Sequence, residues 1–398
     1  MNPAISISIY LLAQLITILQ ARHLLKYSVV PGHSPAIRIA CVVALLVYIP
    51  LALLPVGGAM LQDSRFKFAI QAAGNIWLGF YVYFSFFLLV CWLVLMTIRL
   101  FRGRESTPRV GGVMLAVCAA AGVVILCYGM IHAQRTIRTE LDIPIEKDAG
   151  ELKEMKMILI GDLHLSVNSH LKTIEKMVDM INEEDADVIV IAGDIFTSSY
   201  AGLRDPEKYA QVLRGLKSRE GVYAVYGNHD VEETLFGGFP ITPISQAFRT
   251  KEMEAFFKEC GFTVLYDETV DLAGGAVQLV GRVDGEKAGD GTALRMSPQE
   301  VLSGVDTSKP VVVLQHEPVE FEALKKSGAD LAVCGHTHAG QIFPGNLIVP
   351  FFNENAYGYK VLGGLDTVVT SGIGYYGPPM RVGTDSEVMI LNLHFGEV

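Results

Sequence analysis

The first third of the chain consists of long apolar stretches separated by short polar ones. Four windows contain no Asp, Glu, Lys or Arg, and they cover residues 1–21, 39–62, 68–98 and 110–134. A helix needs about 20 apolar residues to cross the hydrocarbon core of a bilayer, and each window is long enough. The first window lacks the basic start of a cleavable signal peptide. The pattern therefore predicts four transmembrane helices within residues 1–134.

Anchoring is the simplest use of these helices, because apart from His132 they lack the ionisable side chains that usually line a transport pathway. An even number of spans places the N-terminus and the rest of the chain on the same side. The segments between spans on the opposite side hold seven Lys and Arg residues, against five on the domain's own side. The positive-inside tendency then places the soluble part outside the cytoplasm, at the cell membrane. Its two cysteines, Cys260 and Cys334, fit a reducing compartment better, so a cytoplasmic location stays open.

After a charged connector at residues 135–154, the period of the pattern changes. Short β-branched runs alternate with helical patterns, which is typical of a layered α/β domain over residues 155–398. The predicted buried strands cover residues 155–160, 187–191, 222–226, 277–280, 310–314 and 331–333. The predicted helices cover residues 171–181, 205–217 and 245–259, the first of them behind Ser169 as its N-cap.

The two parts of the chain also differ in charge. Residues 1–134 hold nine Lys and Arg and two Asp and Glu, whereas residues 135–398 hold 23 and 40. With 51% hydrophobic and 19% charged residues, the chain is not collagen-like, disordered or a disulfide scaffold. The acidic second part opposes attraction to a phosphate backbone, so no nucleic acid is expected as a partner. No feature of the sequence predicts a protein partner.

Side chains that bind metals follow five of the predicted strands. The five motifs are Gly161-Asp162-Leu163-His164, Gly193-Asp194, Gly227-Asn228-His229-Asp230, Gln315-His316-Glu317 and Gly335-His336-Thr337-His338. Open α/β sheets bind ligands at the carboxyl ends of their strands, so these motifs are expected to meet in one crevice. A lone histidine is more often structural, but five histidines at successive strand ends favour a metal site.

The donor types narrow the chemistry of this site. Oxygen and nitrogen donors without a thiolate suit Mn, Fe or Zn better than copper or a structural zinc. A carboxylate able to bridge suggests two metal ions about 3.5–4 Å apart. Such a pair stabilises the attacking and leaving oxygens of an in-line displacement at phosphorus. The sequence therefore predicts a dinuclear centre that acts on a phosphate-containing substrate.

In their order, the five motifs resemble those of the calcineurin-like metallophosphoesterase superfamily. Together with the apolar start, the chain is similar to bacterial transmembrane proteins with a metallophosphoesterase domain. The resemblance covers residues 155–398 and implies a four-layer α/β sandwich. It implies a first metal on Asp162, His164 and His338, a second on Asn228, His316 and His336, and Asp194 bridging both. It also implies that His229 is the catalytic residue, which either protonates the leaving oxygen or stabilises charge on the phosphoryl group.

One position departs from the family pattern. Many protein-phosphatase members carry an aspartate three residues after the bridging one, paired with the catalytic histidine, and here that residue is Thr197. Either Asp230 or a group of the substrate is then expected to orient His229, or the leaving group needs less help from an acid. Arg381, in the glycine-rich segment 372–383, is a weaker candidate for contact with a substrate anion, and a solvated loop arginine is the alternative.

These observations leave three hypotheses for the function. The first is a membrane-anchored phosphohydrolase that cleaves a phosphoester or pyrophosphate bond of a lipid-linked substrate at the bilayer. A UDP-2,3-diacylglucosamine-type pyrophosphate is one candidate, and it requires a cytoplasmic domain. The second is the same chemistry on soluble nucleotides or other phosphoesters, with the helices only as an anchor. The third is a non-catalytic metal-dependent sensor, which the complete set of seven ligands disfavours.

Overall fold

The computed structural model describes residues 3–26, 35–103, 110–237 and 239–396 and falls into two compact units. The first unit, which we call the helical unit, is Met1–Ile131 with two short segments from later in the chain, Leu235–Ile241 and Gly377–Met380. The second, which we call the α/β unit, comprises His132–Thr234, Thr242–Tyr376 and Arg381–Val398. Each unit has its own apolar core.

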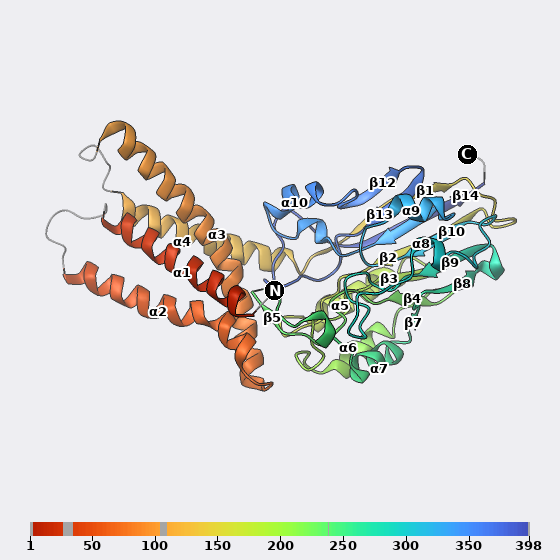
Figure 1. The fold of residues 1–398 in the computed structure, drawn as a ribbon, viewed down its shortest axis with the longest axis horizontal. Coiled ribbons are helices and arrows are strands. Elements are labelled where there is room, and N and C mark those ends of the chain that lie inside the picture. Colours follow the sequence, from red (N-terminus) through yellow and green to blue (C-terminus); the bar gives the residue numbers. More distant parts are fainter. Residues whose placement is uncertain (1–2, 27–34, 104–109, 238, 397–398) are drawn as a thin grey trace. The chain divides into compact units, whose positions relative to one another are not determined.

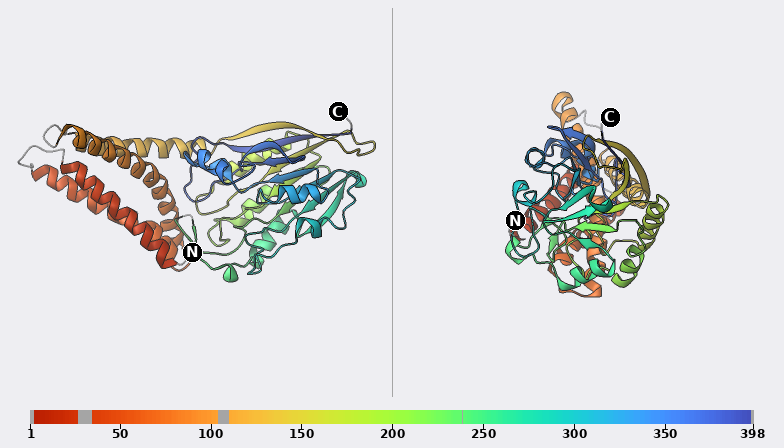
Figure 2. Two further views of the ribbon diagram at one scale, coloured as in Figure 1. Left: turned by 45° about the horizontal axis from the view of Figure 1, so that its top comes forward. Right: turned by 90° about the vertical axis from the view of Figure 1, so that its right-hand side faces the viewer.

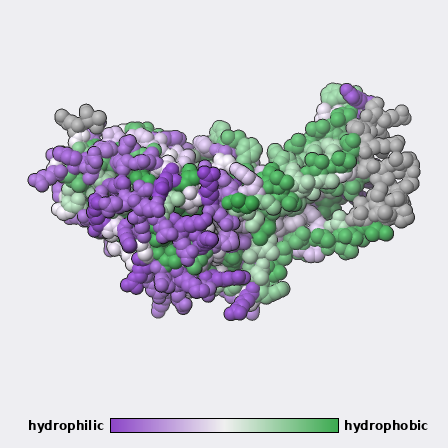
Figure 3. Space-filling model, turned by 180° about the vertical axis from the view of Figure 1, so that it is seen from behind, coloured by the Kyte–Doolittle hydropathy of each residue, from purple (hydrophilic) through white to green (hydrophobic). Residues whose placement is uncertain are grey.

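The helical unit contains four long helices (Figure 1). They are α1 (Pro3–Lys26), α2 (Pro35–Met60), α3 (Arg65–Arg102) and α4 (Gly111–His132). All four are long and apolar enough to cross a membrane, which confirms the prediction from the apolar windows. Figure 3 shows the apolar surface that they present. Arg104 and Arg109, two of the basic residues in the topology count, lie outside the described residues.

The later segment of the helical unit includes a short hairpin, β5 (Leu235–Phe236) and β6 (Phe239–Pro240). Inside the unit, the ring of Phe236 contacts the ring of Tyr10 edge to face, with 5.3 Å between their centroids. The hydroxyl of Tyr10 donates to the carbonyl of Ala52, and the hydroxyl of Tyr48 donates to Gln14. These bonds satisfy polar groups within helices that are otherwise apolar.

The first sheet of the α/β unit has six strands in the order β1, β14, β2, β3, β4, β7. Figure 2 shows the strands of the unit in two further views. Their bounds are Thr136–Ile145, Ser386–Phe395, Glu154–Ile160, Val188–Ala192, Val222–Val225 and Thr263–Val264. The strands β2, β3, β4 and β7 are parallel, and β14 lies antiparallel to β2. Because β2, β3 and β4 are parallel, the segments that follow them emerge at the same edge of the sheet.

The second sheet also has six strands, in the order β12, β13, β11, β10, β9, β8. Their bounds are Gly358–Leu362, Leu365–Val369, Leu331–Cys334, Val311–Leu314, Val277–Gly281 and Glu268–Leu272. The four inner strands are parallel, and the two edge strands are antiparallel to their neighbours. Of the inner strands, β9, β10 and β11 are buried along their whole length, as is typical of strands within a parallel sheet.

Three apolar clusters define the layers. One joins the two sheets through side chains such as Leu159, Val190 and Leu314. A second packs α5 (Leu171–Asn182), α6 (Pro206–Leu213) and α7 (Lys251–Glu259) on the first sheet. A third packs α8 (Pro298–Val301) and α9 (Phe321–Lys326) on the second sheet. The order is helix, sheet, sheet, helix, so the expected four-layer α/β sandwich is confirmed.

All six predicted strands are present, but the connector, one helix cap and the start of one helix differ from the predictions. Residues 135–154, expected as a connector, contain β1, which pairs with β14 over its ten residues. The N-cap of α5 is His170, not Ser169, because the hydroxyl of Ser169 accepts a hydrogen bond from the backbone of Ser166 instead. The helix expected from residue 245 begins at Lys251, where Thr250 caps it.

Candidate metal centre

The polar motifs lie where β2, β3, β4, β10 and β11 end. Several of their residues have left-handed backbone conformations, which are costly for side chains other than glycine. These are Asp162 (φ 50°), His164 (φ 45°), Asp194 (φ 52°), His336 (φ 76°) and His338 (φ 51°). Such strained residues cluster at functional sites. Gly227 must be a glycine, because a Cβ there would overlap the carboxylate of Asp194.

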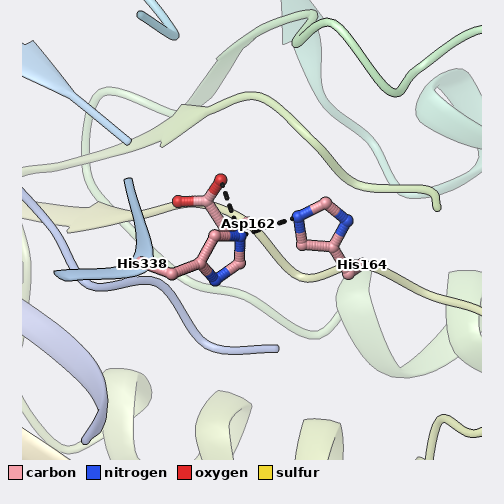
Figure 4. Close-up of side chains that lie close together, drawn as sticks. All are labelled: Asp162, His164 and His338. Atoms are coloured by element: carbon pink, nitrogen blue, oxygen red, sulfur yellow. Dashed lines mark hydrogen bonds and ion pairs between the residues drawn. The ribbon is translucent and has the colours of Figure 1, made fainter. Parts of the chain in front are cut away.

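Asp162, His164 and His338 form the first group of donors, and all three are buried (Figure 4). The Nε2 atoms of the two histidines are 2.9 Å apart, and His338 Nε2 lies 3.7 Å from Asp162 Oδ1. One donor atom from each residue lies within 4.8 Å of the other two. The structure thus brings together the residues that the resemblance assigns to the first metal.

Asn228, His316 and His336 form the second group. His316 Nε2 is 3.0 Å from Asn228 Oδ1 and 3.2 Å from His336 Nδ1. The other ring nitrogen, Nδ1, donates to the carbonyl of Ala192 at 2.7 Å. This bond leaves Nε2 as the nitrogen that faces the other donors. The residues assigned to the second metal are therefore also neighbours.

Asp194 lies between the two groups. Its Oδ2 is 3.5 Å from His164 Nε2 and 3.2 Å from His316 Nε2. Its Oδ1 accepts a hydrogen bond of 2.8 Å from the backbone N–H of His229, which fixes the orientation of the carboxylate. One oxygen therefore points at both sets of donors, as a bridging ligand requires.

The electrostatics of the site fit a cation. Burial raises the pKa of the Asp162 carboxyl to about 7 and lowers the pKa of the His164 imidazole to about 3. Burial alone would also raise the pKa of Asp194, but the charges of His316 and His229 outweigh it and hold that pKa well below its usual value. Carboxylates and imidazole nitrogens facing one another in a buried space are the donor set of a divalent metal site. The residues present fit such an ion.

His229 is oriented by Glu233, which was not predicted from the sequence. Its Nδ1 lies 3.0 Å from Oε1 of Glu233 and 3.1 Å from the hydroxyl of Ser198. Asp230, one of the expected partners, instead accepts hydrogen bonds of 2.9 Å from the backbone N–H groups of Phe196 and Gly227. Both oxygens of Asp230 are therefore used to shape the backbone. The expectation that Asp230 orients His229 is wrong.

The sequence also did not predict several other contacts of the site residues. The hydroxyl of Thr197 lies 3.1 Å from Nδ1 of His164, one of the predicted metal ligands. The amide of Asn228 donates to Glu286 at 2.6 Å, which leaves its Oδ1 facing His316. The ring of Tyr376 stacks on the ring of His229, with centroids 4.4 Å apart. These partners come from loops far apart in sequence and carry no motif that would identify them.

Arg381 is fully buried, unlike a solvated loop arginine. Its guanidinium donates to the carbonyls of Ser371, Gly372 and Gly374 and lies 3.4 Å from His338 Nδ1. Burial lowers its pKa to about 10, so it remains charged at neutral pH. Its Nη1 has no hydrogen-bond partner among the described residues. Contact between Arg381 and a substrate anion stays a prediction.

The comparisons with known proteins agree with this geometry. A family model described as calcineurin-like phosphoesterase matches residues 155–340. A transmembrane protein with metallophosphoesterase domain from Danio rerio is 30% identical over 324 residues, which cover 78% of this chain and 70% of that protein. An uncharacterized metallophosphoesterase from Helicobacter pylori is 33% identical over 61% of this chain and 60% of its own length. One from Campylobacter jejuni is 27% identical over 78% of each chain.

Proposed function

Because the chain belongs to the calcineurin-like metallophosphoesterases, a family of metal-dependent phosphoester hydrolases, we propose that it is a membrane-anchored enzyme with two divalent ions that cleaves a lipid-linked substrate. The bond cleaved is a phosphoester or a pyrophosphate, and a UDP-2,3-diacylglucosamine-type pyrophosphate is one candidate. The ions are Mn, Fe or Zn, the metals that these oxygen and nitrogen donors suit. One ion would be held by Asp162, His164 and His338. The other would be held by Asn228, His316 and His336.

The observation that carries this proposal is the position of Asp194. Its Oδ2 lies within 3.5 Å of a ring nitrogen from each group of donors, His164 and His316. A single-ion site would not need a carboxylate between two sets of ligands. No residue of the seven is missing or turned away, which favours a working hydrolase over a non-catalytic sensor.

The geometry gives each side chain a part in hydrolysis. Divalent ions at such a centre lower the pKa of water and stabilise charge on the phosphoryl oxygens. The backbone N–H of His229 holds Asp194 in place, and Glu286 turns the oxygen of Asn228 toward the site. The ring of His229 is clamped between Glu233 and the face of Tyr376, so its Nε2 is the atom available to give a proton to the departing oxygen.

Two features support a substrate that lies in a membrane. The chain has four helices able to cross a bilayer. In the α/β unit, residues 339–353 follow the ligand His338 directly and contain no Asp, Glu, Lys or Arg. Within this segment Phe351 and Phe352 are 85% and 81% exposed, and Leu347 is 57% exposed. Exposed apolar side chains of this kind mark contact with lipid or with an apolar ligand.

The test compares substrates that differ only in their anchor. The full chain, loaded with Mn²⁺ in phospholipid vesicles, is given a monoester, a diester and a pyrophosphate, each in a diacyl and a short-chain soluble form. We expect the diacyl form of the preferred bond to be hydrolysed with at least tenfold higher kcat/KM, because the bilayer confines enzyme and substrate together. Equal or faster hydrolysis of the soluble form would contradict a lipid-linked substrate and support the alternative of soluble phosphoesters.

A further inference from the structure

His229 is held by a charged network whose members come from three separate loops. We propose that Glu233, supported by Lys287 and Ser198, positions His229 to protonate a strongly basic leaving oxygen, and that the substrate is a phosphate ester of an alcohol. This inference rests on the proposed function and narrows it, because it disfavours phosphate anhydrides such as pyrophosphates. Glu233 is a positioning residue, since it acts through the ring of His229.

Glu233 has every feature of a fixed hydrogen-bond acceptor. Its side chain is fully buried, and its Oε1 lies 3.0 Å from His229 Nδ1. The ammonium of Lys287 donates to both carboxylate oxygens, at 2.9 and 2.8 Å. The hydroxyl of Ser198 donates to Oε1 at 2.9 Å. With both oxygens occupied, the carboxylate cannot rotate away from His229.

The network keeps the carboxylate ionised. Burial of Glu233 would raise its pKa, but the hydrogen bond from His229 and the charge of Lys287 outweigh burial, and the pKa lies below its usual value. The side chain of Lys287 is only 3% exposed, so each charge depends on the other for compensation. The carboxylate beside Nδ1 fixes the orientation of the ring and leaves Nε2 as the nitrogen that faces the site.

The opposite ring nitrogen faces the metal centre. His229 Nε2 lies 3.5 Å from the amide nitrogen of Asn228, one of the predicted ligands. The stacked ring of Tyr376 covers one face of the imidazole. Glu233 on one side and Tyr376 on another therefore fix the direction in which Nε2 points. That direction is toward the predicted metal ligands, where the phosphoryl group is expected to bind.

A positioned proton donor matters only for some leaving groups. The second pKa of a phosphate group is about 6, so a departing phosphate leaves as an anion at neutral pH and needs no proton. An alcohol oxygen resembles that of water, with a pKa of about 15.7, and must be protonated as it leaves. General acid catalysis in such cases contributes about 10²–10⁴-fold. The buried charges of Glu233 and Lys287 together fix the ring of His229. This arrangement favours a substrate whose leaving group is an alcohol.

The step is a hydrolysis in which every atom has a source. The oxygen of a water molecule forms the new bond to phosphorus, and the bond from phosphorus to the alcohol oxygen breaks with its electron pair. The alcohol oxygen takes the proton from Nε2 of His229. The ring then recovers the proton that the attacking water releases. Glu233 keeps its charge throughout.

The experiment compares leaving groups in the Glu233→Gln variant of the full, Mn²⁺-loaded chain. We expect kcat for an alkyl phosphoester to fall on the order of 10²-fold. For the p-nitrophenyl ester and for a pyrophosphate we expect a loss below about fivefold, since these leave without a proton. KM and metal content are expected to stay unchanged. Glu322→Gln, the same change at a side chain that is 80% exposed, serves as the control and should match the wild type.

Two results would overturn the inference. An equal loss on all three substrates would mean that Glu233 supports the fold or the metals and not proton transfer. If the wild-type enzyme hydrolysed the pyrophosphate faster than the alkyl ester, the substrate would not be a phosphate ester of an alcohol. If Glu233→Gln does not fold because Lys287 is left unpaired, the double change Glu233→Gln with Lys287→Met removes both charges and gives the same comparison. Failure of the wild type to hydrolyse any phosphoester would instead contradict the proposed function.

Discussion

The substitution Asp194→Asn is expected to abolish hydrolysis, with kcat/KM falling about 10³-fold or more. Asn keeps the shape of the side chain but removes the negative charge that lies between the two groups of donors. Metal ions contribute several kcal/mol to the stabilisation of such a transition state. A loss of about 4 kcal/mol corresponds to about 10³-fold in rate. The measurement is phosphoester hydrolysis by the full chain with Mn²⁺, together with the metal content of the variant.

The matched control is Asp205→Asn, which makes the same change at a side chain that is 66% exposed and forms an ion pair with Lys208 on the surface. It should retain wild-type activity and metal content. If Asp194→Asn hydrolysed phosphoesters within tenfold of the wild-type rate, Asp194 would not bridge two ions and the proposed centre would be wrong.

A second large effect is expected for Arg381→Met, this time on stability. The guanidinium donates to three buried backbone carbonyls, those of Ser371, Gly372 and Gly374. Each buried acceptor left without a partner costs about 1–3 kcal/mol, so the α/β unit should lose about 3 kcal/mol or more. For a unit of this size the unfolding temperature would fall by about 6–12 °C.

This prediction needs a probe inside the α/β unit, because both tryptophans, Trp77 and Trp92, belong to the helical unit. The thiol of Cys334 is fully buried in β11, and its labelling on heating, measured by mass spectrometry, reports unfolding of the right unit. Both proteins are measured with a chelator present, so that a difference in metal binding cannot cause a difference in labelling. Arg219→Met is the control, since Arg219 is 60% exposed and bonds to surface carboxylates. Equal labelling of Arg381→Met and wild type would show that the buried guanidinium does not support this loop.

The parts of the fold that the sequence predicted are those whose side chains are buried on both faces. The inner strands β3, β10 and β11 are unbroken apolar runs, so their pattern is strong. The strand β1 was missed because its polar and apolar side chains are mixed and only two of its ten residues, Ile143 and Ile145, are buried. The short strand β7 has two residues, too few to show any period. Tertiary pairing with a neighbour, not local pattern, makes these segments strands.

The same distinction applies to the site. The ligand positions could be predicted because each motif directly follows a strand and the strands are parallel. The partners of His229 could not, since they depend on how separate loops meet in space. Lys287 and Glu233 are 54 residues apart, and their ion pair exists only once the fold is complete. An aspartate at position 197 would have been found by comparison with the family, but a glutamate that takes its place from position 233 has no such signal.

Anomalous diffraction from crystals of the full chain grown with Mn²⁺ would locate the two ions that the seven side chains are proposed to hold, with Asp194 between them. We expect two peaks about 3.5–4 Å apart. One should lie against Asp162, His164 and His338, the other against Asn228, His316 and His336, with an oxygen of Asp194 contacting both. A single peak, or two peaks that do not share Asp194, would contradict it.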